Sequence, residues 1–149
     1  MKIAIGSDHL GLELKNIIED FLKEKEIEFK DFGTISREPL DYPDIARKVT
    51  RAITKGDCER GILICGTGIG MAIAANKVKG IRAAVCHDLY STERSRKSNN
   101  AQIMTMGAQI IGSEPAKKLV EIWLNSEFQG GHSKRKVQKI MEIERENFS

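Results

Sequence analysis

Short hydrophobic runs alternate along the chain with longer segments in which apolar residues recur every three or four positions. The runs span residues 3–7, 27–32, 61–65, 82–86 and 102–106. The first is followed by apolar residues at the spacing of one helix face: Leu14, Ile17, Ile18, Phe21 and Leu22. The pattern predicts five strands separated by helices. Two further helices are expected after the last strand, one starting near residues 113–115 and one in the basic tail.

The first, third and fourth runs are almost unbroken hydrophobic segments. Such strands are covered on both faces, as in a parallel sheet with helices on either side. We therefore predict one domain over residues 1–149. It is an α/β three-layer sandwich with a five-stranded parallel sheet in the order 2-1-3-4-5 and a C-terminal helix. Ligands of such sheets bind at the carboxyl ends of the strands where the order reverses, here between strands 1 and 3.

The charge and hydrophobicity of the chain limit which kinds of binding partner we expect. The chain has 24 Lys and Arg against 21 Asp and Glu, a net charge of +3. That charge is too small to demand nucleic acid or a membrane, although it suits a small anionic ligand. The longest uncharged stretch, residues 61–76, contains four glycines and is shorter than the ~18 to 20 apolar residues of a membrane span.

The cysteines and histidines set further expectations. Cys58, Cys65 and Cys86 are an odd number, and the chain start has no apolar run long enough for a secretory signal, so a cytoplasmic protein is expected. No H-x3-H or C-x2-C spacing is present. We therefore predict no metal and no cofactor.

Polar residues follow strands 1 and 3, whose ends should lie side by side. Strand 1 ends in Ser7-Asp8-His9, and strand 3 ends in the segment CGTGIG, residues 65–70. Its glycines let backbone N–H groups point at an anion, helped by the positive end of the following helix. A tight connection between strand and helix remains the alternative.

Known nucleotide and phosphatase loops fit this segment poorly. A dinucleotide-binding G-x-G-x-x-G counted from Gly66 needs glycine at position 71, and a phosphatase C-x5-R loop needs arginine there. The chain has Met71 instead, and no Gly-Lys-Ser/Thr triplet. Nucleotide binding and phosphatase chemistry are therefore disfavoured.

Three side chains near this loop have two interpretations each. Cys65, at a helix N-terminus, is expected to have a lowered pKa and to act as a general base, or else to be a buried structural thiol. Thr67 stabilises an oxyanion or caps the helix. His9 faces the loop or is an ordinary hydrogen-bonded loop residue.

Two polar segments lie outside this loop. Residues 91–100 contain no apolar side chain and form either a solvated helix face or the lining of a site or subunit interface. The tail GGHSKRKVQK, residues 130–139, carries cations that contact either solvent or a phosphate, the latter in a neighbouring subunit.

Several motifs together resemble one family. They are SDHLGLELK from residue 7, DYPD from 41, ICGTGIGMAIAANKVKGIRAA from 64, SRKSNN from 95 and FQGG from 128. The sequence closely resembles type B ribose-5-phosphate isomerases over essentially its whole length. The wider family includes galactose-6-phosphate isomerase subunits and allose-phosphate isomerases.

The resemblance implies a Rossmann-like homodimer, or a tetramer of such dimers, with active sites shared between subunits. It also implies metal-free aldose–ketose interconversion through an enediolate. Cys65 would move the proton between C2 and C1. Thr67 and the loop amides would hold the oxygens, the amides being those of Gly66, Gly68, Ile69 and Gly70. Asp8 and Tyr42 would bind sugar hydroxyls, and His9 and Asn99 of the partner subunit would also contact the substrate.

The chain departs from the family pattern at the ring-opening and phosphate positions. Ser98 stands where a histidine normally opens the sugar ring. Gln109, His132 and Lys136 replace arginines, with Arg135 beside the last. We expect ribose 5-phosphate isomerisation. The alternatives are allose, psicose or their 6-phosphates as substrates, or a sugar-phosphate-binding subunit without activity.

Overall fold

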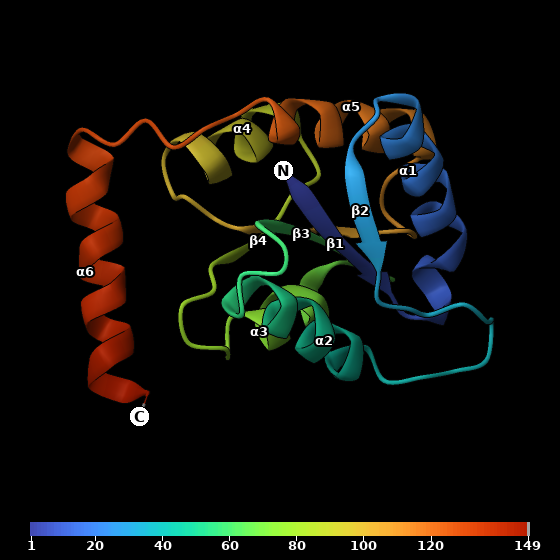
Figure 1. The fold of residues 1–149 in the computed structure, drawn as a ribbon, viewed down its shortest axis with the longest axis horizontal. Helices are drawn as coiled ribbons and strands as arrows, with labels where there is room; N and C mark the ends of the chain where they lie inside the picture. The colour runs from blue at the N-terminus through green and yellow to red at the C-terminus, as the bar shows by residue number, and fades with distance from the viewer. Residues whose placement is uncertain (149) are drawn as a thin grey trace.

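The computed structural model describes residues 1–148 and contains one parallel sheet (Figure 1). Its strands run in the order β2-β1-β3-β5-β4. Their bounds are β1 Lys2–Ser7, β2 Glu28–Asp31, β3 Arg60–Cys65, β4 Ala83–Val85 and β5 Ile103–Gly107. The predicted α/β class and the five-stranded parallel sheet are confirmed.

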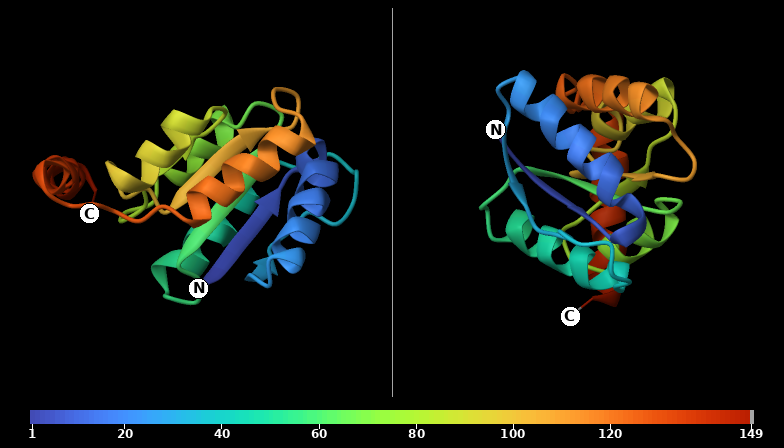
Figure 2. Two further views of the ribbon diagram at one scale, coloured as in Figure 1. Left: turned by 90° about the horizontal axis from the view of Figure 1, so that it is seen from above. Right: turned by 90° about the vertical axis from the view of Figure 1, so that its right-hand side faces the viewer.

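The helices form layers on both faces of this sheet (Figure 2). One face is covered by α1 (Leu12–Glu24), α4 (Leu89–Lys97) and α5 (Ser113–Leu124). The other is covered by α2 (Tyr42–Thr54) and α3 (Ile69–Ala75). A short 3-10 helix, η1 (His9–Gly11), links β1 to α1, and α6 (His132–Asn147) follows a connecting segment after α5.

The order of the last two strands differs from the prediction, because β5 lies between β3 and β4. All five residues of β5 are buried, whereas β4 has three residues and none is fully buried. The longer apolar strand therefore occupies the interior, and the short one forms an edge. The predicted crevice is unaffected, since β1 still pairs with β3.

Alternation along β1 and β3 builds two cores. Ile3 and Ile5 of β1, with Ile62 and Ile64 of β3, pack in the core under α1 and α5. Leu63 and Cys65 belong to the core that contains the apolar face of α2 and α3. Because side chains alternate along a strand, Cys65 leaves the end of β3 on the α2–α3 side.

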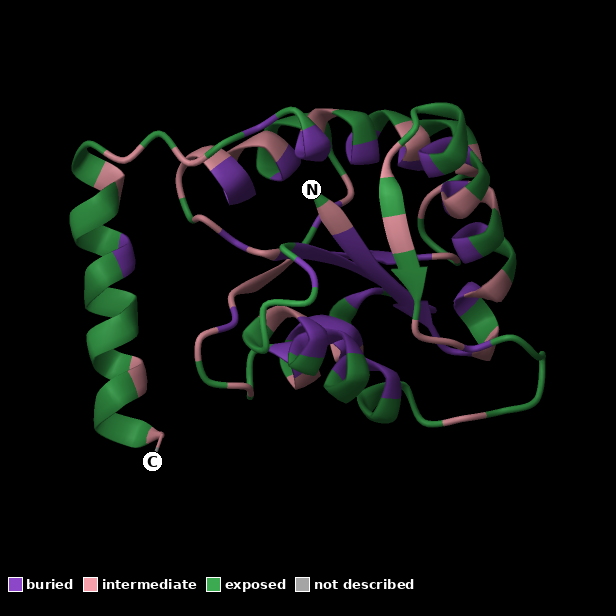
Figure 3. Ribbon diagram, viewed as in Figure 1, coloured by how far each residue is buried: buried purple, intermediate pink, exposed green. Residues whose placement is uncertain are grey.

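Helix α6 stands apart from the three layers, and most of its surface is exposed (Figures 1 and 3). Val137 is its one buried residue, while Ile143 is 60% exposed. Among residues 1–148, every helix is too short or too polar to cross a membrane.

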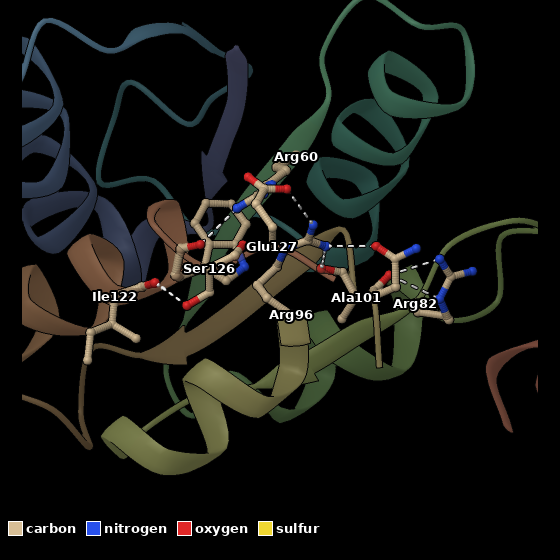
Figure 4. A network of polar contacts seen from close by, with 9 residues as sticks. Arg60, Arg82, Arg96, Ala101, Ile122, Ser126 and Glu127 are labelled. Atoms are coloured by element: carbon tan, nitrogen blue, oxygen red, sulfur yellow. Dashed lines mark hydrogen bonds and ion pairs between the residues drawn. The ribbon is translucent and has the colours of Figure 1, made fainter. Parts of the chain in front are cut away.

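Two buried arginines attach the segment after α5 to the amino ends of the strands (Figure 4). Arg60 donates to the Trp123 carbonyl at 2.8 Å and to Glu127 Oε1 at 2.7 Å. Arg96 donates to the Ala101 carbonyl at 2.8 Å. Burial, and then the nearby charge of Arg60, lower the pKa of Arg96 to about 10. Arg96 stays protonated at neutral pH, and the network fixes the loop after α4.

Candidate active site

Asp8 follows β1 directly and is oriented by the backbone of η1. Its Oδ1 accepts hydrogen bonds from the N–H groups of Leu10 and Gly11, each at 3.1 Å. Its own N–H donates to the Ile64 carbonyl at 3.2 Å, and a Cβ at Gly11 would lie 2.7 Å from that same oxygen. The chain after β1 is thus pressed against the end of β3, and the carboxylate of Asp8 is held in one orientation.

The loop after β3 curls around the sulfur of Cys65. Gly68 has φ +80°, a left-handed conformation that glycine adopts without strain, and its N–H donates to Cys65 Sγ at 3.2 Å. The Gly68 carbonyl accepts from Thr105 Oγ1 at 2.7 Å. Thr67 Oγ1 accepts from the Ile69 N–H at 3.2 Å and so caps the start of α3. The same side chain is exposed at the cavity wall, which leaves both interpretations of Thr67 compatible with its position.

The end of β5 supports the loop from the neighbouring strand. The Ala108 N–H donates to the Cys65 carbonyl at 2.8 Å, and the Gln109 N–H donates to the Gly66 carbonyl at 3.0 Å. A Cβ at Gly107 would lie 2.5 Å from Thr67 Cα and 2.6 Å from the Gly66 carbonyl oxygen. Only glycine at 107 permits this approach of the two backbones.

Tyr42 reaches the loop from the start of α2. A Cβ on Gly70 would lie 2.4 Å from Tyr42 Cζ and 2.7 Å from its Oη. The tyrosine ring therefore occupies the space that a side chain at 70 would fill, and the phenol lies over the first turn of α3.

These elements enclose a cavity of about 440 Å³ at the carboxyl ends of β1 and β3. Its wall is made of Asp8, Leu10, Tyr42, Cys65, Gly66, Thr67, Ile69, Gly70, Ile73 and Gln109. Cys65 is only 5% exposed and lies at the floor. A thiol, hydroxyls, a carboxylate and loop amides thus converge on a partly apolar hollow, the usual make-up of a small-molecule site.

A second hollow of about 420 Å³ lies between α4 and α5. It is lined by lysine, glutamate and amide side chains together with Leu89, Ile122 and Ser126. Neither a glycine-rich loop nor a cysteine borders it among the described residues. We therefore assign the candidate site to the Cys65 cavity on its chemistry.

His9 lies beside this cavity and not in its wall. Its Nδ1 accepts from the Leu40 N–H at 3.2 Å, so the neutral ring carries its proton on Nε2. It lines a smaller hollow of about 300 Å³ with Leu10, Leu12, Glu13 and Arg37. Leu10 borders both hollows, so His9 is a neighbour of the Cys65 cavity.

Within one chain, Ser98 and Asn99 lie toward the amino ends of the strands, at the end of the sheet opposite Cys65. They follow α4, which returns from the carboxyl end of β4 to the amino end of β5. Ser98 Oγ accepts from Arg94 Nε at 2.8 Å, and Asn99 is exposed. One chain does not bring these residues to Cys65.

The predicted phosphate contacts are also divided. Gln109 lines the cavity, whereas His132, Arg135 and Lys136 are exposed on the first turns of α6, apart from the layers that hold the cavity (Figure 1). Within residues 1–148, no group of three or more His, Cys, Asp or Glu side chains is arranged to hold a metal ion.

Sequence reasoning missed the support from β5. Thr105, Gly107 and Ala108 contact the loop only because β5 is adjacent to β3, and the predicted order placed β4 there. Residues 103–106 are apolar except for Thr105, and this pattern was the available signal for an interior strand. Leu10 and Ile73, which form apolar wall, were not anticipated either.

The fold and loop together define an α/β protein with a small-molecule site at the switch point of a parallel sheet. A match to the family described as Ribose/Galactose Isomerase spans residues 3–140. The chain belongs to this family and is an aldose–ketose isomerase.

Individual relatives are similar over nearly their full length. A Listeria innocua protein named Ribose-5-P isomerase B is 57% identical, covering 99% of each chain. A Pectobacterium atrosepticum protein named D-erythrulose-4-phosphate isomerase is 51% identical, covering 94% of this chain and 93% of its own. The structure of a Clostridium thermocellum ribose-5-phosphate isomerase B superposes with a TM-score of 0.96 at 52% identity, covering 98% of this chain and 99% of that one.

Proposed function

We propose that this protein interconverts ribose 5-phosphate and ribulose 5-phosphate, with Cys65 as the base and an enediolate as the intermediate. The observation that carries the proposal is the placement of Cys65 Sγ, held by the Gly68 N–H at 3.2 Å at the floor of the cavity. The Listeria and Clostridium relatives carry the same activity in their names. The three cysteines are unpaired, which suits a cytoplasmic enzyme.

The proposed reaction moves one hydrogen between adjacent carbons. The Cys65 thiolate removes the proton from C2 of the open-chain aldose, and the electron pair forms the C1–C2 double bond of an enediolate. The π electrons of the C1 carbonyl move to O1. The resulting thiol then returns the proton to C1, the hydroxyl proton of O2 passes to O1, and the carbonyl forms at C2. A positioned base contributes ~10² to 10⁴ in rate to such a step, and donors to the developing oxyanion contribute a comparable factor.

The remaining cavity residues have roles that their hydrogen bonds support. Thr67 Oγ1 already accepts from Ile69, so its own proton is available to a substrate oxygen. Gly66, Ile69 and Gly70 of the loop border the same space, whereas the Gly68 N–H donates to Cys65 Sγ and the Ile69 N–H to Thr67 Oγ1. Asp8 and Tyr42 are proposed to bind sugar hydroxyls, because both lie in the wall beside Cys65.

We further propose that the site is completed by a second copy of the chain. Among residues 1–148, the wall of the Cys65 cavity contains no lysine or arginine, so a phosphate finds no cation there. His132, Arg135 and Lys136 are exposed on α6, whose apolar residues Ile140 and Ile143 are also open to solvent. A homodimer would cover that face and bring these cations, with Ser98 and Asn99, to the partner's cavity.

A tetrose phosphate is the second candidate substrate. The Pectobacterium relative is named D-erythrulose-4-phosphate isomerase. A tetrose with phosphate on O4 cannot close a furanose ring, so its isomerisation needs no ring-opening group. Ser98, which stands where the family normally has a histidine, fits such a substrate.

A substrate panel decides between these activities. It compares kcat/KM for ribose 5-phosphate, erythrulose 4-phosphate, allose 6-phosphate, free ribose and free allose, with Cys65→Ala as the blank and Cys58→Ala as the matched control. We expect ribose 5-phosphate to react best, and free sugars to react ~10² or more times less efficiently because they lack charge-assisted hydrogen bonds. A preference for erythrulose 4-phosphate or for a free aldose would replace the proposal, and a wild-type protein inactive on all five would refute it.

A further inference from the structure

His87 lies outside the Cys65 cavity and yet connects to its loop. It follows β4 and lines a separate hollow of about 330 Å³ with residues of the α4 start and of α5. Its Nε2 accepts the Gly107 N–H at 2.8 Å. No role in substrate contact follows from this position, because His87 is absent from the cavity wall.

Gly107 is the point at which β5 touches the Cys65 loop. It is paired with Cys65 in the β3–β5 register, and its backbone approaches Thr67 so closely that a Cβ would lie 2.5 Å from Thr67 Cα. The next two N–H groups of the chain, those of Ala108 and Gln109, donate to the carbonyls of Cys65 and Gly66. The orientation of the Gly107 peptide therefore governs three successive contacts with the loop.

We propose that His87 is a positioning residue: its neutral Nε2 holds the Gly107 N–H and so keeps the end of β5 pressed against the Cys65–Thr67 loop. This inference rests on the proposed function for its effect on turnover. The hydrogen bond that it depends on joins His87 Nε2 to the Gly107 N–H, and neither residue lies in the cavity wall.

The bond exists only while the imidazole is neutral, because a doubly protonated ring has no acceptor nitrogen. Burial lowers the pKa of His87 below its ordinary value, and the nearby charge of Asp88 opposes the shift. Glu114 and Lys118 of α5 are the other charged groups in the same hollow. His87 is therefore neutral at pH 7, and acidification breaks the bond.

Two variants separate the acceptor from the titration. Glutamine at 87 offers an amide oxygen at the reach of Nε2 and does not titrate, whereas phenylalanine keeps the volume and offers no acceptor. We expect His87→Phe to lower kcat about 10- to 100-fold with KM within about threefold, because small displacements of a catalytic group cost this much. His87→Gln should retain most of kcat at pH 7 and should lose a smaller share of it on acidification than the wild type does.

Amide hydrogen exchange measured by mass spectrometry supplies the readout that does not depend on turnover. Peptides covering residues 65–68 and 105–109 should exchange faster in His87→Phe than in the wild type, and at the wild-type rate in His87→Gln. The substrate phosphate titrates identically in all variants, so differences between their pH profiles belong to residue 87.

Wild-type kcat or wild-type exchange in His87→Phe would overturn the proposal. If His87→Phe does not fold, the glutamine variant decides, and an acid limb identical to that of the wild type would overturn it. A wild-type protein with no isomerase activity would refute the proposed function, while the exchange comparison would still show whether His87 holds Gly107.

Discussion

The glycines of the Cys65 loop differ in what makes them necessary, and the structure assigns each a reason. Gly68 is required by its positive φ, Gly107 by the close approach of Thr67, and Gly70 by the ring of Tyr42. The sequence indicated that the glycine-rich segment makes a tight turn and placed Cys65, Thr67 and Asp8 near one another. It could not indicate that Tyr42 occupies the space above Gly70, because that contact joins elements 28 residues apart in the chain.

A methyl group at position 70 tests the role of Tyr42. Gly70→Ala places Cβ 2.4 Å from Tyr42 Cζ, so the phenol must leave the cavity wall. Alanine favours the helix by ~1 kcal/mol, so the melting temperature should not fall. We expect kcat/KM for the sugar phosphate to drop about tenfold, a loss on the order of one hydrogen bond to a hydroxyl. Steady-state kinetics with a melting curve measures both.

Gly112→Ala is the matched control, since its nearest atom would be an ordinary contact at 3.8 Å. Unchanged kcat/KM in Gly70→Ala would show that Tyr42 is not needed in its observed place.

At the scale of elements, α1 and β2 are joined by a lysine that pairs with two carboxyl groups. Lys15 is 1% exposed, contacts Asp31 of β2 and lies 3.4 Å from Glu19 Oε1. Burial, followed by the hydrogen bond with Asp31, raises the pKa of Glu19 to about 7. The helical periodicity of residues 14–22 predicted α1 correctly. It did not predict this cluster, which depends on the register that places β2 beside β1.

The raised pKa of Glu19 implies a stability that depends on pH. The folded protein keeps the Glu19 proton up to about pH 7, whereas an unfolded glutamate loses it near ~4.3. The unfolded state binds fewer protons between these values, so this group makes stability fall as pH rises through that window and then level off. Glu19→Gln removes this slope. We expect its melting temperature, relative to wild type, to rise by about 2 to 4 °C between pH 5 and pH 8.

Glu13→Gln serves as the comparison, because Glu13 is 72% exposed and its ion pair with Arg37 is at the surface. If the melting temperatures of the wild type and Glu19→Gln change equally between pH 5 and pH 8, the raised pKa of Glu19 is contradicted.

The strand order shows why the pattern of strands and helices along the chain did not predict which strand supports the Cys65 loop. Residues 82–86 and 102–106 are both apolar runs, and local sequence does not say which of them pairs with β3. The structure places β5 there because its five residues bury completely. The crevice between β1 and β3 was predictable, since it depends on the first three strands only.

At the scale of the whole molecule, residues 1–148 of one chain form the Cys65 cavity without a lysine or arginine in its wall. The sequence supplied candidates for both halves of the site, and the fold separates them: Asp8, Tyr42 and Thr67 line the cavity, while Asn99 and Lys136 lie elsewhere. Periodicity carries no information about which surface a second copy covers. Charge and polarity made the tail cations and residues 91–100 candidates, and the family pattern assigned Asn99 to the partner's cavity.

Hybrid dimers test the shared site. A dimer of one Cys65→Ala chain and one Asn99→Ala chain, purified through two different tags, contains one cavity with both residues intact if Asn99 comes from the partner. We expect about half of wild-type activity from the hybrid and almost none from either parent dimer. If Asn99 served its own chain, both cavities would be broken and the hybrid would be inactive. A protein that sediments as a monomer while fully active would also contradict the shared site.

The measurement that bears most directly on the account compares turnover with binding in Cys65→Ala. Removing the proposed base should lower kcat for ribose 5-phosphate by ~10³-fold or more, because the alanine side chain cannot take the C2 proton. The dissociation constant, measured by calorimetry, should stay within about threefold of the wild-type value, since the walls of the cavity are unchanged. A Cys65→Ala protein that keeps more than about a tenth of the wild-type kcat would show that the proton is taken by another group.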